Sequence, residues 1–242
     1  MHINILTIFP EIFDALNYGV IGKAKTNKSF SIKLQDIRDY PVNKHGQIDS
    51  KPYGGGEGMV MMAEPLKRSL ESIPKEKLGK IIYLSPQGAL FDNTKAKELS
   101  KEPSATFICG RYEGIDQRFI DKYVDEEISI GDFIISGGEI AALCIIDSII
   151  RHIPGVLGNK DSSKNDSFSN GLLKGPQYSR PEVFEEISVP DILLSGDHKK
   201  IKEWKDLKSI EATIIRRPDL LNNVKLTKKQ RKLLEDLASQ SI

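Results

Sequence analysis

Three glycine-rich segments could form a binding site built largely from main chain. They read SPQG at 85–88, CGRYEGID at 109–116 and SIGDFIISGGE at 129–139. Each follows or lies beside a short apolar run typical of a β-strand, and glycine lets backbone N–H and C=O groups approach a ligand closely. In an open α/β sheet such loops converge at the carboxyl ends of the strands, where small molecules bind. The spacing alone favours ordinary turns, because glycine is common in loops of any kind, and the binding-site interpretation stays open here.

The usual phosphate-binding patterns are missing from the sequence. No GxGxxG opens a helix after the first apolar run, and no GxxxxGK[ST] occurs, which makes a nucleotide-binding ATPase a distant alternative. PYGGGEGM at 52–59 fits neither motif and is interpreted as a flexible loop. Cys109 and Cys144 stand 35 residues apart without a CxxC, and His45, His152 and His198 lack metal-ligand spacing. We expect two buried, reduced thiols and no metal cluster.

The hydrophobic pattern predicts an α/β domain over residues 1–158. Strands are expected at 3–9, 80–85, 105–109 and around 128, and helices at 10–16, 92–101, after 116 and at 139–152. Pro10 suits a first helical turn, and Asp92 and Asp116 suit helix N-caps. Because strands alternate with helices of this size, the sheet should be mostly parallel.

The remainder of the chain differs in composition. Residues 159–171 read NKDSSKNDSFSNG, which is typical of an interdomain linker. Residues 172–242 are expected to form a small helical domain. Within it, 199–216 carries one apolar stripe that includes Trp204, and Thr227 with Gln230 forms a capping-box signature that predicts a last helix to about 238.

Charge is distributed unevenly although the formal net charge of the 242 residues is only +1. Between Lys199 and Lys232 there are twelve Lys and Arg against four Asp and Glu, which favours contact with phosphate at that end. Apolar residues at 39% and charged residues at 29% exclude a disordered chain. There is no signal-peptide pattern and no apolar stretch of membrane-spanning length, so we expect a cytoplasmic protein without membrane contact.

Taken in order, several motifs resemble one known family. PYGGGEGMVMM, YLSPQG, CGRYEGID, SIGDFIISGGE, RHIPGVLG, DSFSNGLL and QYSRPEVF are similar to segments of the bacterial tRNA (guanine-N1)-methyltransferases, the TrmD type of SPOUT methyltransferase. The resemblance runs from LTIFPEIF near the start to LTKKQRKLLE near the end. Each motif alone is modest, but their number, order and spacing are specific.

This resemblance implies a fold, a reaction and partners. The fold would be a SPOUT domain with a deep trefoil knot, in a homodimer with each cofactor site at the subunit interface. The helical C-terminal domain would help to hold tRNA. The reaction would transfer the methyl group of S-adenosyl-L-methionine (SAM) to N1 of the guanosine immediately 3′ of the anticodon, position 37. The resemblance also implies assistance by Mg²⁺, although no metal-ligand cluster is visible.

The resemblance further assigns roles to individual residues. Asp166 matches the catalytic aspartate of the family, and Arg151 matches an arginine of the target-base site. Asn170 and Lys174 stand where some relatives have aspartates, which leaves Asp166 as the stronger candidate. The residues that match the SAM site are Tyr83, Leu84, Ser85, Pro86, Gly88, Gly110, Arg111, Tyr112, Glu113, Gly114, Ser129, Ile130, Gly131, Ile135, Gly137 and Gly138.

The chemistry explains why such residues are needed. Guanine N1 carries a proton at neutral pH, so a carboxylate must accept it as N1 attacks the methyl group. Negative charge then builds on O6, which a guanidinium stabilises. The stacked base must also be turned out to reach the cofactor. Without the resemblance, Asp166 fits a solvated linker residue, and Arg151 fits a cation that complements a helix C-terminus.

Two other functions remain as alternatives. One is a related knotted methyltransferase that acts on ribosomal RNA or on a ribose 2′-hydroxyl, which needs no carboxylate beside a guanine. The other is a non-catalytic RNA-binding factor, which would lack affinity for SAM.

Overall fold

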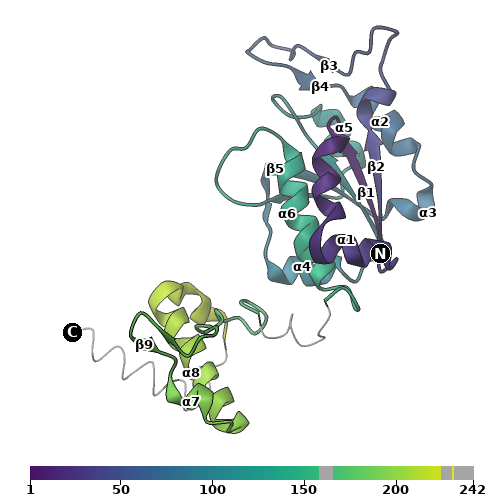
Figure 1. Ribbon diagram of the computed structural model, residues 1–242. Helices are drawn as coiled ribbons and strands as arrows, with labels where there is room; N and C mark the ends of the chain where they lie inside the picture. Colours follow the sequence, from purple (N-terminus) through teal and green to yellow (C-terminus); the bar gives the residue numbers. More distant parts are fainter. Residues whose placement is uncertain (158–165, 225–230, 232–242) are drawn as a thin grey trace. The chain divides into compact units, whose positions relative to one another are not determined.

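The computed structural model describes residues 1–157, 166–224 and 231, and the chain divides into two units, Met1–Gly158 and Asn159–Ile242 (Figure 1). Most of the predicted linker and the helix predicted over 227–238 lie outside the described residues. The two units are described separately below.

A five-stranded parallel sheet forms the centre of the first unit. Its strands are β1 (His2–Thr7), β2 (Ser31–Asp36), β5 (Lys80–Leu90), β6 (Ser104–Cys109) and β7 (Glu126–Ser129), in the order β2-β1-β6-β5-β7. Every neighbouring pair is parallel. The α/β class and the parallel sheet predicted from the alternating pattern are therefore confirmed.

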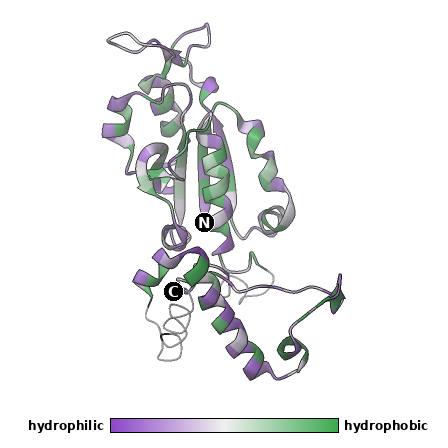
Figure 2. Cartoon of the chain, turned by 90° about the vertical axis from the view of Figure 1, so that its left-hand side faces the viewer, coloured by the Kyte–Doolittle hydropathy of each residue, from purple (hydrophilic) through white to green (hydrophobic). Residues whose placement is uncertain are grey.

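Helices cover both faces of this sheet, because successive strand residues point to opposite sides. Ile82 and Leu84 join a cluster with α6 (Gly138–Arg151), whereas Tyr83 joins the cluster on the other face. The first face also carries η1 (Pro10–Asn17), α1 (Gly19–Thr26) and α4 (Asn93–Leu99). The second face carries η2 (Ile37–Asp39), α2 (Ala63–Glu71), α3 (Lys75–Leu78) and α5 (Gln117–Tyr123). Figure 2 shows green, apolar stretches in the strands and helices of this unit.

Several local predictions are confirmed and two need correction. Asp92 accepts a hydrogen bond from Lys95 N at 2.7 Å, and Asp116 accepts one from Arg118 N at 2.9 Å, as N-caps do. The predicted helix after Pro10 is a 3₁₀-helix. The strand predicted at 80–85 extends to 90, because residues 85–88 loop out and Ala89 then pairs with Ile128.

The burial expected for both cysteines is correct for only one of them. Cys109 is buried in β6, but Cys144 is exposed. The helix α6 directs Ile145, Ile146 and Ile149 into the core. The 3.6-residue helical period places Cys144 outside that buried stripe, so an apolar neighbourhood in sequence did not mean burial.

The glycine-rich segment at 52–59 is the loop of a small ribbon between β3 (Asp49–Ser50) and β4 (Val60–Met61). The end of this loop is hydrogen-bonded to the second glycine-rich segment. Glu113 N donates to Met59 O at 2.9 Å, and Met61 N donates to Gly114 O at 3.0 Å. Two main-chain hydrogen bonds therefore hold the end of this loop against the segment at 109–116.

The second unit contains a short antiparallel ribbon and one long helix. The ribbon pairs β8 (Val183–Phe184) with β9 (Ile187–Ser188), and the helices are α7 (Asp191–Leu194), α8 (His198–Arg216) and η3 (Pro218–Asn223). The helix predicted at 199–216 is confirmed, and Asp197 caps it by accepting from Lys199 N and Lys200 N at 3.1 Å each. Leu173 N donates to the buried Thr213 Oγ1 at 2.9 Å, which ties the preceding segment to α8.

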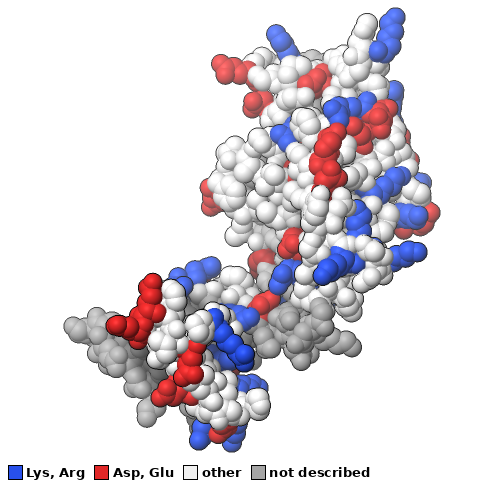
Figure 3. All heavy atoms as spheres, viewed as in Figure 1, with Lys and Arg blue, Asp and Glu red and all other residues white. Residues whose placement is uncertain are grey.

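Basic and acidic side chains are mixed in this second unit, as its visible face shows (Figure 3). Lys208 Nζ lies 2.6 Å from Glu211 Oε2, and Arg217 Nη2 lies 2.6 Å from Asp219 Oδ2. Part of the positive charge counted from the sequence is thus paired locally. Over the described ranges, no helix is both long and apolar enough to span a membrane.

Candidate functional site

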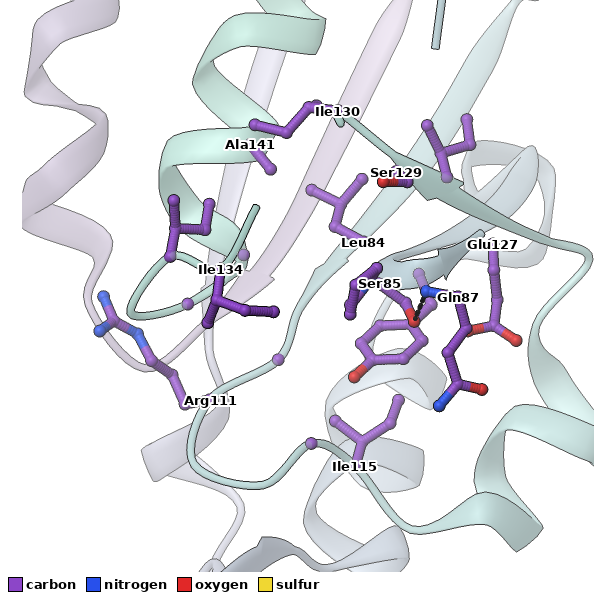
Figure 4. A pocket seen from close by; sticks show the side chains of 18 of the residues that line it. Leu84, Ser85, Gln87, Arg111, Ile115, Glu127, Ser129, Ile130, Ile134 and Ala141 are labelled. Carbon is purple, nitrogen blue, oxygen red and sulfur yellow. Dashed lines mark hydrogen bonds between the residues drawn. The ribbon is translucent and has the colours of Figure 1, made fainter. Parts of the chain in front are cut away.

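The three glycine-rich segments meet at one cavity, at the carboxyl ends of β5, β6 and β7 (Figure 4). Its volume is about 410 Å³, within the range of small-molecule sites. Every residue that the sequence matched to a SAM site lines this cavity except Gly88. The sequence therefore identified the residues that the fold brings together here, while their role in binding SAM stays a prediction.

Gly88 lies outside the lining for a reason internal to the sheet. A Cβ atom on Gly88 would overlap the backbone of Glu127 and Ile128 in β7. The glycine is thus explained by the close approach of the looped part of β5 to the neighbouring strand.

The cavity also contains residues that the sequence did not single out as ligands. They are Gln87, Ile115, Gln117, Ile120, Glu127, Ile128, Phe133, Ile134, Ser136 and Ala141. Gln87, Ile115 and those at 133–136 stand inside the glycine-rich motifs and could have been included on that ground. Gln117 and Glu127 come from α5 and β7, where no glycine pattern marks them.

Tyr83 forms part of the wall beneath the second loop. Its side chain is buried, and this burial, together with the nearby charge of Glu127, raises the pKa of Tyr83 to about 12. The phenol is therefore neutral at ordinary pH. A Cβ atom on Gly110 would stand 2.8 Å from the Tyr83 hydroxyl oxygen, so glycine is required where the chain passes over the ring.

The first loop turns through a side-chain contact, since Ser85 Oγ accepts a hydrogen bond from Gln87 N at 3.1 Å (Figure 4). The third loop uses the same device, with Ser129 Oγ accepting from Gly131 N at 3.2 Å. Serine hydroxyls commonly stabilise turns in this way.

The second loop contains two unusual backbone conformations. Tyr112 has φ 59° and Gly114 has φ 113°, and left-handed values are uncommon for a residue such as tyrosine. Burial and the charge of Asp49 raise the pKa of Tyr112. A Cβ atom on Gly58 would stand 2.6 Å from the side chain of Glu113, so the loop of the β3–β4 ribbon lies directly against this carboxylate.

A buried ion pair joins the second loop to the start of α6. Arg111 Nε donates to Glu139 Oε2 at 2.8 Å, and Thr7 Oγ1 donates to Glu139 Oε1 at 2.8 Å. The guanidinium also lies over the Phe9 ring, 4.6 Å from its centroid, an attractive cation–π contact.

Burial, reinforced by the charge of Glu139, raises the pKa of the Cys109 thiol well above its ordinary value, so this thiol is un-ionised.

The two residues matched to the chemical step lie in different units. Arg151 is the exposed last residue of α6. Asp166 belongs to the second unit, where Lys174 Nζ lies 3.4 Å from its Oδ1. Asn170 Oδ1 accepts a hydrogen bond from Leu172 N at 3.1 Å. The contact that the structure gives for Asp166 within its own unit is thus with Lys174. Joint action of Asp166 and Arg151 on one base stays a prediction.

The groups that line the cavity suit a planar, heterocyclic ligand. Main-chain N–H and C=O groups from three loops can pair with the edges of a heterocycle, and Leu84, Ile130 and Ala141 offer apolar contact to its faces. Phe133 and Ile134 are exposed on the third loop. Among the residues at 1–157, 166–224 and 231, no group of three or more His, Cys, Asp or Glu side chains could hold a metal ion.

Comparison with known proteins gives a consistent result. A family model described as tRNA (Guanine-1)-methyltransferase TrmD matches residues 1–223. A tRNA (guanine-N(1)-)-methyltransferase of Clostridium novyi is 50% identical over 235 residues, which is 97% of each chain. Proteins of the same name from Clostridium botulinum and Clostridium beijerinckii are 48% and 49% identical over 236 residues, 98% of each chain.

Proposed function

Because the chain belongs to the family of tRNA (guanine-1)-methyltransferases, we propose that it transfers the methyl group of SAM to N1 of the guanosine at position 37 of tRNA, immediately 3′ of the anticodon. One observation carries the cofactor part of this proposal. The three segments that resemble the family's SAM loops, far apart in sequence, line a single cavity at the carboxyl edge of the sheet.

The residues around this cavity fit SAM. The volume of about 410 Å³ suits a nucleoside joined to an amino acid. The main chain of 85–87, 110–114 and 129–138 would hold adenine and ribose, and apolar side chains would exclude water. SAM supplies an electrophilic methyl group, and Glu113 lies in the loop where that group is expected.

Asp166 and Arg151 would act on the guanine. As N1 attacks, Asp166 accepts its proton, and Arg151 balances the negative charge that develops on O6. General-base assistance is typically worth about 10²–10⁴-fold in rate, and loss of one electrostatic donor costs about 10²–10³-fold. Lys174, which contacts Asp166, would have to release Oδ1 when the base arrives.

The trefoil knot is part of the proposal because SPOUT methyltransferases have it. Two contacts support close interlocking of the relevant loops. Gly138 N donates to Gly110 O at 2.9 Å, and Phe91 N donates to Ser129 O at 2.8 Å. The first of these bonds holds the end of the segment at 129–138 against the second cofactor loop, and the second continues the pairing of β5 with β7 just past the first loop.

We also propose that the active enzyme is a homodimer with its site at the interface. Support comes from large apolar side chains exposed around the cavity, which are Leu90, Phe133, Ile134 and Ile140. Figure 3 shows the face around the loop left of β5 as largely uncharged. A second copy of the chain would cover such a surface, because clustered exposed apolar groups favour association.

tRNA would be held by the second unit, and the enzyme would work where tRNA is, in the cytoplasm.

Mg²⁺ is implied by the family resemblance. It would be held by one or two carboxylates together with oxygens of the substrates, as is common for this ion.

The experiment is methyl transfer from labelled SAM to unmodified tRNA. Label should enter tRNA that has guanosine 3′ of the anticodon and should not enter a variant with adenosine there. Equal labelling of both tRNAs would contradict the proposed target.

A further inference from the structure

Glu139 is fully buried, yet it is a carboxylate. It lies in the first turn of α6, where the helix N-terminus favours negative charge. Its two oxygens have separate partners, Thr7 Oγ1 at 2.8 Å and Arg111 Nε at 2.8 Å. Thr7 Oγ1 in turn accepts from Phe9 N at 2.9 Å. One side chain thereby joins the end of β1, the second cofactor loop and α6.

Stability alone does not account for such a pair. Burying two charges carries a large desolvation penalty, and apolar replacements of a buried pair are often equally stable or more so. The pair instead fixes a position, because it holds the Arg111 side chain, which is only 16% exposed, in one place. Removing one partner alone leaves an uncompensated buried charge, which strongly favours rearrangement.

The place where Arg111 is held lies between two walls of the cavity. Its backbone belongs to the second loop, while its Nη1 donates to Ser136 O of the third loop at 3.0 Å. A Cβ atom on Gly137 would overlap the Arg111 side chain. The arginine therefore passes closely over the third loop, and Figure 4 shows it at the edge of the pocket beside Ile134.

We propose that Glu139 is a positioning residue for cofactor binding: by holding Arg111 it fixes the second loop against the third and sets the width of the SAM cavity between them. This inference rests on the proposed function, because it assumes that the cavity binds SAM. Glu139 would act only through Arg111 and would not touch the cofactor.

A double-mutant cycle on the full-length protein tests this role. Glu139→Gln, Arg111→Met and the double variant are compared by SAM binding in calorimetry and by thermal unfolding. Either single variant should weaken SAM binding by about tenfold or more, the worth of one charge-assisted hydrogen bond. The double variant leaves no unpaired charge, so its unfolding temperature should recover toward that of the parent. Its SAM affinity should stay as weak as that of the single variants.

Recovery of SAM affinity together with stability in the double variant would mean a purely structural role and would overturn the proposal. Unchanged affinity in Glu139→Gln would overturn it too. If Glu139→Gln does not fold, Glu139→Asp tests the same point, since it keeps the charge but loses reach. Parent-like affinity in Glu139→Asp would likewise count against positioning.

A matched control is Glu126→Gln, which removes a carboxylate paired with Lys80 at 3.0 Å and Lys95 at 2.7 Å. Glu126 does not line the cavity, so this variant should lose stability but keep its SAM affinity. Failure of the SAM-binding part of the proposed function is distinguishable, because the parent protein itself would then bind no SAM, whereas a different RNA target would leave this test unaffected.

Discussion

The hydroxyl oxygen of Tyr83 stands 2.8 Å from the position that a Cβ atom on Gly110 would occupy. The expected reason for this glycine was the approach of a ligand to the backbone. The structure supplies another reason, since the glycine leaves room for the buried ring beneath the loop. The Tyr83 ring and the loop at Gly110 therefore pack directly against each other, and both line the cavity.

Gly110→Val should abolish SAM binding and leave the secondary structure intact. The added side chain must displace either the Tyr83 ring or the loop, and both line the cavity. Calorimetry measures the affinity, and circular dichroism measures the fold. Gly46→Asn is the control, because Gly46 has φ 80° in an open loop, which asparagine tolerates. Parent-like SAM affinity in Gly110→Val would rule out this packing argument.

Tyr83 should make stability sensitive to alkaline pH. Burial raises the pKa of Tyr83 from 10.0 to about 12, so the stabilisation is complete below pH 10 and is lost as pH rises toward 12. Between pH 8 and pH 11 the parent should lose about 1 kcal/mol more unfolding free energy than Tyr83→Phe. Denaturant titrations measure this difference, with the exposed Tyr18→Phe as control. Equal losses in the parent and Tyr83→Phe would contradict the assignment.

Much of the fold could be predicted because its signals are local. The aspartate caps at 92 and 116 and the apolar run of α6 each depend on a few neighbouring residues. The looping-out of 85–88 could not be predicted, because it depends on pairing with β7 some 40 residues later.

The site divides in the same way. Its glycine-rich loops are visible in sequence, but the Glu139 network joins residues 28 and 132 positions apart. A glutamate in a first helical turn is ordinarily explained by the helix dipole alone. Nor does the sequence indicate that Lys174 contacts Asp166, because an exposed lysine has many reachable partners.

Asp166→Asn should lower the single-turnover rate of methyl transfer by about 10²-fold or more, because the amide cannot accept the N1 proton. tRNA affinity should change little, since the side chain keeps its size. Asp219→Asn is a matched control, as Asp219 is also an aspartate paired with a cation, its Oδ2 lying 2.6 Å from Arg217 Nη2. The role of Asp166 as base fails if both variants keep the parent rate.

The basic side chains of the second unit should supply phosphate contacts. The stretch from Lys199 to Lys232 includes Lys228 and Lys229, which lie outside the described residues. Lys199, Lys202 and Lys205 are exposed on α8 and can be tested directly. Changing all three to glutamate should weaken tRNA binding and leave SAM affinity unchanged.

The salt dependence separates phosphate contact from a general charge effect. Each lost contact should reduce the slope of log K against log salt by about 0.7–0.9, as filter binding across a salt series would measure. Reversing Lys28, Lys33 and Lys75, which are exposed in the first unit, is the control. The same loss in both triple variants would argue against a specific tRNA surface on α8.

The most direct test is to locate the transferred methyl group. Unmodified tRNA is incubated with SAM and the enzyme, digested with nuclease and analysed by mass spectrometry. We predict one new methyl group, on guanine N1 in the fragment that contains position 37, and only a small fraction of it when Asp166→Asn replaces the parent for the same single-turnover reaction time. A methyl group on a ribose 2′-hydroxyl, or on a base elsewhere in the tRNA, would contradict the account.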